Sequence, residues 1–143
     1  MAKRVSFKQQ IKNNLIAIIS IFIAISSLAY NTWRNEQTEY NRNVRTSSFE
    51  IIMALVELQL LIDYAYYEDE SKHDAIKGWS YVLYVRDLTT AMSQSSQLAC
   101  EPLFSVWQQH FDNVVDNEQS TVAVTATITN CREQVLTELR ELE

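Results

Sequence analysis

Glycine and proline are almost absent from this chain. Gly78 and Pro102 are the only ones among 143 residues. All-β folds need such residues repeatedly in their tight turns, so the composition argues against a hairpin-rich domain. It predicts an all-α fold of long helices with short connections.

The residues that most often carry catalysis or hold metals are also few, with two histidines and two cysteines. His73 and His110 stand alone, without the paired spacing of a zinc site, and one glycine cannot form a phosphate-binding loop. The acidic run Glu68-Asp69-Glu70, with Asp74, offers oxygen ligands for calcium, but it lacks the EF-hand pattern and is equally typical of a solvated loop. We expect a protein that is not an enzyme and holds no metal or cofactor.

One stretch without any charge dominates what is present. Residues 15–30 read LIAIISIFIAISSLAY, and the flanking Ile11, Thr32 and Trp33 extend this apolar run. Together they reach the roughly 17 to 25 residues that cross a bilayer core as a helix. The sequence therefore predicts a transmembrane anchor over residues 15–33, preceded by a basic head over 1–14 and followed by a domain over 34–143.

Charge on the two sides of this stretch predicts its orientation. Lys3, Arg4, Lys8 and Lys12 precede it without any acid, whereas all eighteen acidic residues follow Tyr30. Positively charged segments stay in the cytoplasm, so we expect a bacterial inner-membrane protein with a cytoplasmic N-terminus and a periplasmic domain. The acidic domain argues against nucleic acid as a partner, because phosphate binding needs a basic face.

A cleaved signal peptide is the alternative interpretation of the same stretch. Ser27-Leu28-Ala29 resembles a small-x-small cleavage site after a basic n-region. Against it, the apolar run continues to that site without a helix breaker, and Tyr30 with Trp33 is typical of an interfacial anchor. The domain would lie outside the cytoplasm in both cases.

The anchor helix is expected to continue into the domain and end near Tyr67. Its apolar residues recur at three-four spacing and form two adjacent rows, or seams, along the helix. Two seams predict two neighbouring helices. The first seam contains Val44, Ile51, Leu55, Leu58 and Ile62, and the second contains Phe49, Ile52, Val56 and Gln59.

Three further helices are expected. Ser71 with Asp74 has capping-box spacing and predicts a helix that runs towards Met92. A connection over residues 93–98 follows, and Pro102 suits the first position of the next helix. Asn117 is a plausible cap for the last. Residues 121–129, TVAVTATIT, alternate as in a half-buried strand, which would need residues 81–85 as its pairing partner. An apolar stripe, however, continues through these residues into a strongly helix-forming segment, which favours a helix.

These segments predict an antiparallel four-helix bundle whose first helix emerges from the membrane. The architecture resembles the periplasmic sensing bundle of bacterial chemoreceptors, without their second span and signalling helix. The segments YNTWRNE (residues 30–36), GWSYV (78–82) and RDL (86–88) resemble small, uncharacterised single-span membrane proteins of Gram-negative bacteria. That second resemblance covers most of the chain and implies no activity.

A membrane-tethered interaction module is the function that we expect, with binding of a partner protein, or self-association, at the inner membrane. Trp33, Tyr40 and Val44 form a narrow stripe after the anchor and are the candidate partner-binding residues. The alternative is a small-molecule sensor with its pocket inside the bundle.

Arg86, Tyr81 and Tyr84 are the candidate ligand-binding residues of that alternative. Arg86 interrupts an apolar helix face, so it would either pair with a carboxylate, Glu57 or Asp63 being the candidates, or recognise an anionic ligand or partner. The tyrosines are also typical of ordinary core or rim packing.

The two cysteines, Cys100 and Cys131, predict a disulfide. An even count in a domain outside the cytoplasm is its usual setting, and two antiparallel helices joined near residue 117 would bring the two positions level. The alternative is a small core residue at 131 and a free thiol at 100.

Overall fold

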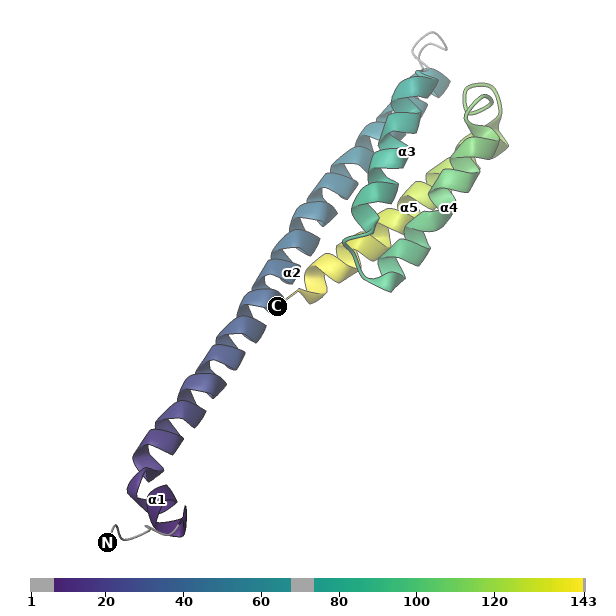
Figure 1. The fold of residues 1–143 in the computed structure, drawn as a ribbon. Coiled ribbons are helices and arrows are strands. Elements are labelled where there is room, and N and C mark those ends of the chain that lie inside the picture. The colour runs from purple at the N-terminus through teal and green to yellow at the C-terminus, as the bar shows by residue number, and fades with distance from the viewer. Residues whose placement is uncertain (1–6, 68–73, 143) are drawn as a thin grey trace, which may run out of the picture. The chain divides into compact units, whose positions relative to one another are not determined.

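The computed structural model of the protein describes residues 7–67 and 74–142, and all regular structure within these ranges is helical (Figure 1). The helices are α1 (Phe7–Asn13), α2 (Leu15–Tyr67), α3 (Ala75–Thr89), α4 (Gln94–His110) and α5 (Glu118–Glu141). The all-α prediction is therefore confirmed. The chain divides into two compact units, residues 1–40 and 41–143, whereas the sequence placed the start of the helical domain at residue 34.

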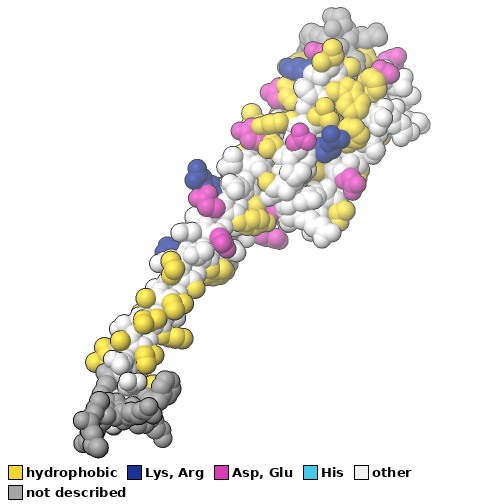
Figure 2. All heavy atoms as spheres, in the orientation of Figure 1, with side chains coloured by type: hydrophobic (Ala, Val, Ile, Leu, Met, Phe, Trp, Pro, Cys, Tyr) yellow, Lys and Arg dark blue, Asp and Glu magenta, His cyan; other side chains and the backbone are white. Residues whose placement is uncertain are grey.

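The first unit contains α1 and the beginning of α2. Asn14 lies between the two helices, and its side-chain Nδ2 donates to the carbonyl oxygen of Gln10 at 3.0 Å. Apolar side chains cover the following turns of α2 and are exposed to solvent, and Figure 2 shows no charged side chain among them. This helix is long and apolar enough to cross a membrane.

The first seam of α2 lies in the core of the second unit. All five of its residues are completely buried, as the three-four spacing predicts. They form one apolar cluster with buried side chains of the other helices: Val82 and Val85 of α3, Leu103 and Trp107 of α4, and Val124, Ile128 and Val135 of α5. Within this unit α3 packs on α4, and α4 packs on α5 (Figure 1).

The second seam of α2 does not behave as one surface. Ile52 packs against the core, and Gln59 Nε2 donates to the hydroxyl of Thr125 on α5 at 3.2 Å. Phe49 and Val56 instead are exposed. Within the described residues, the second seam is therefore covered only in part, and its outer side carries no helix.

Helix α3 begins at Ala75, with Asp74 as its N-cap. The Asp74 carboxylate accepts from the backbone N–H of Lys77 at 2.9 Å, which satisfies one of the free donors of the first turn. The structure thus places Asp74 at the cap position, whereas the capping-box spacing predicted Ser71 there, which lies outside the described residues.

Gly78 in α3 is buried against the indole of Trp107 in α4. A Cβ atom at this position would lie 2.2 Å from Cζ2 of that ring. The single glycine is therefore required by a tryptophan ring packed against the helix.

Helix α4 begins eight residues before Pro102, so the prediction that Pro102 opens it is wrong. Ser93 is the cap instead, in an extended conformation, with its hydroxyl accepting from the backbone N–H of Ser96 at 3.4 Å. Pro102 lies inside the helix and supplies no N–H to the carbonyl of Leu98 one turn earlier. The serine-rich residues 94–98, interpreted as a connection, form its first turn.

Helix α5 includes residues 121–129, so the helical interpretation is confirmed over the strand. Threonine hydroxyls donate to backbone carbonyls of the preceding turn: Thr127 to Val124 at 2.7 Å and Thr129 to Thr125 at 2.9 Å. Such bonds accommodate β-branched residues in a helix. Asn117 caps α5 as predicted, and its side chain accepts from the N–H of Ser120.

Candidate functional site

The stripe of Trp33, Tyr40 and Val44 is only partly available to a partner. Trp33 and Tyr40 are exposed, and the Trp33 ring lies 6.1 Å from that of Tyr30. Val44 is completely buried in the core of the second unit, so its assignment as a contact residue is wrong. Val44 follows Tyr40 at helical spacing, but it is the first residue of the buried seam of α2. Contact through Trp33 and Tyr40 stays a prediction.

A second set of apolar side chains on α2 is exposed within the second unit. We call Phe49, Met53, Val56, Leu60 and Tyr67 the α2 stripe; their exposed fractions are 56%, 59%, 37%, 40% and 77%. At 100° per residue they share one face of the helix, opposite the buried seam. Residues 49–60 of the stripe form a continuous apolar surface, which Asp63 separates from Tyr67. Such a surface is typical of a contact site in a soluble domain. The sequence did contain the signal, because Phe49 and Val56 belong to the second seam.

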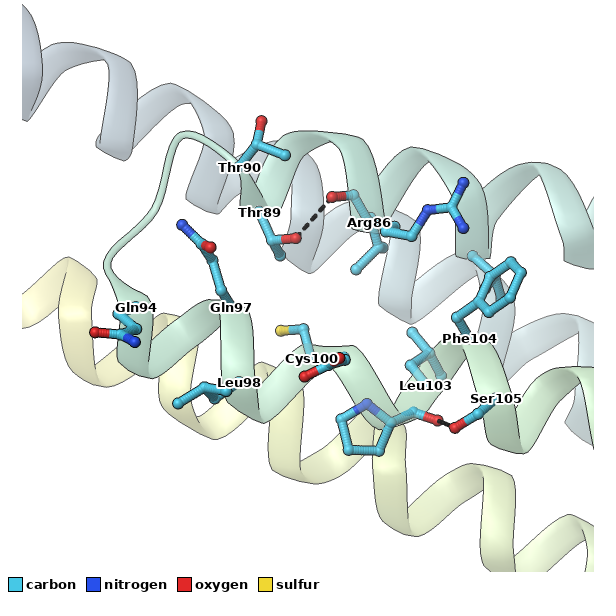
Figure 3. Close-up of a pocket in the computed structure, with 14 residues that line it drawn as sticks. Arg86, Thr89, Thr90, Gln94, Gln97, Leu98, Cys100, Leu103, Phe104 and Ser105 are labelled. Atoms are coloured by element: carbon cyan, nitrogen blue, oxygen red, sulfur yellow. Dashed lines mark hydrogen bonds between the residues drawn. The ribbon is translucent and has the colours of Figure 1, made fainter.

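A groove of about 770 Å³ lies between α3 and α4 (Figure 3). Arg86, Thr89, Gln97 and Phe104 are among its lining side chains, and the Arg86 guanidinium carbon lies 4.5 Å above the centre of the Phe104 ring. Arg86 forms no ion pair with any residue that the structure describes, so the expected pairing with Glu57 or Asp63 is wrong. The aromatic ring gives the cation a favourable contact in place of a carboxylate.

Tyr81 and Tyr84 do not line this groove. The Tyr81 hydroxyl donates to Glu57 at 3.5 Å, and the Tyr84 hydroxyl donates to Glu50 at 3.1 Å, so both tyrosines connect α3 to α2. The hydrogen bond to Glu50 is the largest reason that the pKa of Tyr84 lies above its ordinary value of 10.0, followed by desolvation and by the charge of the carboxylate. The three candidate ligand-binding residues therefore do not converge on one pocket.

Cys100 and Cys131 form the expected disulfide, with sulfur atoms 2.01 Å apart and Cα atoms 4.5 Å apart. Both are buried, and the bond joins α4 to α5 across 31 positions of sequence. Cys100 lies inside α4 rather than just before it. The closed loop includes the end of α4 and the start of α5.

Glu138 is an important residue that the sequence interpretation missed. This buried carboxylate of α5 accepts from the Ser93 backbone N–H at 2.8 Å, from the Ser93 hydroxyl at 2.7 Å and from the Ser96 hydroxyl. A negative charge at the start of α4 is also favourable for the helix dipole. A glutamate within a charged C-terminal helix gives no local signal for this role, because its partners lie 42 and 45 residues away.

Of the two histidines, His110 has a structural contact, and His73 lies outside the described residues. His110 Nδ1 lies 3.0 Å from the hydroxyl of Ser120, a contact that joins the end of α4 to the first turn of α5. Ser120 is only 4% exposed, so a substrate has no access to it. No group of side chains that fits a metal ion occurs in the described ranges 7–67 and 74–142. Of the acidic run weighed for calcium, only the capping residue Asp74 lies within them.

Comparison with known proteins gives no match to any family model, curated protein or solved structure.

Proposed function

We propose that this protein is a membrane-tethered helical module that binds a partner protein at or near the bacterial inner membrane. In this proposal the first part of α2 spans the bilayer, with the N-terminus in the cytoplasm. The domain of residues 41–143 is a periplasmic antiparallel bundle of α2, α3, α4 and α5. The chain belongs with the small single-span membrane proteins of Gram-negative bacteria that its sequence resembles.

The α2 stripe is the observation that carries this function. It offers apolar side chains over about 27 Å of helix, given the rise of 1.5 Å per residue. Monomeric soluble domains rarely leave such a surface uncovered, and partner contact is the usual reason for one. The disulfide supports a location outside the cytoplasm, because such bonds persist in oxidising compartments.

Replacing Ile21 by Arg tests the tether. A charge at the middle of the span costs about 2.5 to 3.5 kcal/mol of insertion free energy, so the variant should lose membrane retention. Ile21→Leu is the matched control and should stay in the membrane fraction after carbonate extraction. Release of the wild-type chain by carbonate would contradict the tether, and a C-terminal reporter active only in the cytoplasm would contradict the orientation.

Site-specific photo-crosslinking in intact membranes tests partner binding. A photo-reactive benzoyl-phenylalanine in place of Met53 should give a defined adduct after illumination. The same amino acid in place of Val122, an apolar residue of α5 that is 60% exposed, is the control and should give none. Equal labelling at the two positions, or none at Met53, would contradict contact through the α2 stripe.

Small-molecule sensing is the second candidate, and the groove between α3 and α4 favours it. Arg86 offers a cationic group for an anionic ligand there, with threonine and glutamine side chains beside it. The groove opens at the surface, and the tyrosines expected to line it lie elsewhere. A rise in unfolding temperature with a small organic acid, lost in Arg86→Ala but kept in Arg132→Ala, would support sensing; no rise would count against it.

A further inference from the structure

We propose that the α2 stripe is the contact surface for α2 of a second copy of this chain, with the two helices parallel. This inference rests on the proposed function, because it names the partner of the tethered module. Two copies anchored in one membrane with the same orientation meet with their α2 helices pointing the same way.

The spacing of the stripe fits pairing of a helix with its own copy. Phe49, Met53, Val56 and Leu60 follow one another at intervals of four, three and four residues, and Tyr67 follows seven residues later. This is the alternation of d and a positions in a coiled-coil seam. A two-fold axis along such a seam places each residue beside its own counterpart, which makes the surface self-complementary. Asp63 at the next d position limits the continuous part to residues 49–60.

Charges beside the stripe favour the parallel direction. With Met53 at an a position, Arg45 lies at g, and Glu50 and Glu57 lie at e. In a parallel pair, a g residue of one helix lies near the e residue five positions further along the other, which brings Arg45 near Glu50 of the second copy. Both side chains are exposed, and only the Oε2 atom of Glu50 accepts from Tyr84. An antiparallel pair would instead place glutamates near glutamates.

The size of the stripe indicates a dimer that depends on the anchor. Its five side chains expose roughly 400 to 600 Å² per copy, below the ~800 Å² per partner of a standard stable interface. Contact through this area alone is weak in dilute solution. Confinement in a membrane raises the effective concentration of the second copy and so compensates for the weak affinity of a small interface.

Cysteine cross-linking of the full chain in membrane vesicles tests the proposal. Met53→Cys and Val56→Cys should each give a disulfide-linked dimer under mild oxidation, several-fold more than Val122→Cys, because only the stripe residues meet their counterparts. The native cysteines are joined to each other and do not compete. Arg45→Glu should lower the yield of Met53→Cys dimer, and adding Glu50→Arg should restore it.

Two cross-linking results would overturn the second copy as occupant. One is equal yields at Met53, Val56 and Val122, and the other is no dimer at either stripe position while circular dichroism shows native helicity. A photo-adduct at Met53 with a different protein, without a cysteine-linked dimer, would also overturn it and leave the proposed function standing. Loss of the dimer together with loss of every Met53 adduct would count against both the second copy as occupant and the proposed function. An unchanged yield in Arg45→Glu would refute the parallel direction.

Discussion

Replacing Gly78 by Ala should destabilise the protein, although alanine is the better helix former. The exchange gains about 1 kcal/mol of helix propensity. The new methyl group, however, would lie 2.2 Å from Cζ2 and 2.6 Å from Cη2 of Trp107, where 3.4–4 Å is ordinary contact. Trp107 is completely buried, so the ring cannot swing away and α3 must separate from α4. Overpacking costs about 1 to 3 kcal/mol, occasionally more, and a clash this close belongs at the upper end.

We therefore expect a net loss of about 1 to 2 kcal/mol. For a domain of this size, that lowers the unfolding temperature by at least about 4 °C, measured by circular dichroism of the full chain in detergent. Ser80→Ala, at an exposed position of the same helix, is the control and should change stability by less than about 0.5 kcal/mol.

A double-mutant cycle with Trp107→Phe identifies the cause. Phenylalanine lacks the part of the indole nearest Gly78, and it also removes the buried Nε1 donor, which has no hydrogen-bond partner in the described part of the chain. Gly78→Ala should therefore cost clearly less in the Trp107→Phe background, with a coupling free energy of about 0.5 to 3 kcal/mol. An unchanged or raised unfolding temperature in Gly78→Ala, or costs that simply add, would refute the packing of α3 against this ring.

Three further predictions concern other contacts of the helical domain. Glu138→Gln should cost about 1 to 3 kcal/mol in thermal unfolding, since it removes a buried charged acceptor from the start of α4, whereas the exposed Glu133→Gln should be nearly neutral. Reducing the bond between Cys100 and Cys131 should cost about 3 to 4 kcal/mol in the chain-entropy model, and mass spectrometry of alkylated, non-reduced protein should find neither thiol free. Tyr84 stabilises the fold up to about pH 10 and loses this contribution as the pH rises further, because its pKa is raised in the folded state, so Tyr84→Phe should weaken the alkaline dependence of stability.

Each of these predictions has a contrary outcome. Equal effects of Glu138→Gln and Glu133→Gln would mean that the carboxylate does not cap α4. Two alkylated thiols in protein isolated without reductant would refute the bond and weaken the proposed periplasmic placement. Identical stability profiles of wild type and Tyr84→Phe above pH 10 would show that the bond to its carboxylate partner does not form in solution.

Periodicity predicted the fold well wherever one helix face is buried along its whole length. Val44, Ile51 and Leu58 are buried as their spacing requires, and the same argument correctly chose helix for residues 121–129. Local rules worked where the signal is a single residue next to its own backbone, as with the Asn117 cap. They failed at Pro102, because its preference for a first turn was outweighed by the serine cap and carboxylate contacts at the start of α4.

The candidate sites were less predictable, because they depend on which surfaces the other helices leave open. Val44 follows Tyr40 at helical spacing, and nothing local shows that the core begins between them. Arg86 looked like one half of an ion pair, yet an aromatic ring on α4 provides its contact. The disulfide is the exception, since two cysteines in one domain allow a single intramolecular pairing.

Pro102 and the disulfide have a joint consequence for local opening of the structure. The proline removes one hydrogen bond from the ladder of α4, and Cys100, two residues earlier, fixes this part of the helix to α5. The covalent link therefore holds α4 where its backbone resists unwinding least. In the oxidised protein we expect slow amide exchange on both sides of the proline. After reduction, residues 98–106 should become the first part of α4 to exchange, and the wall of the groove beside Arg86 would open with them.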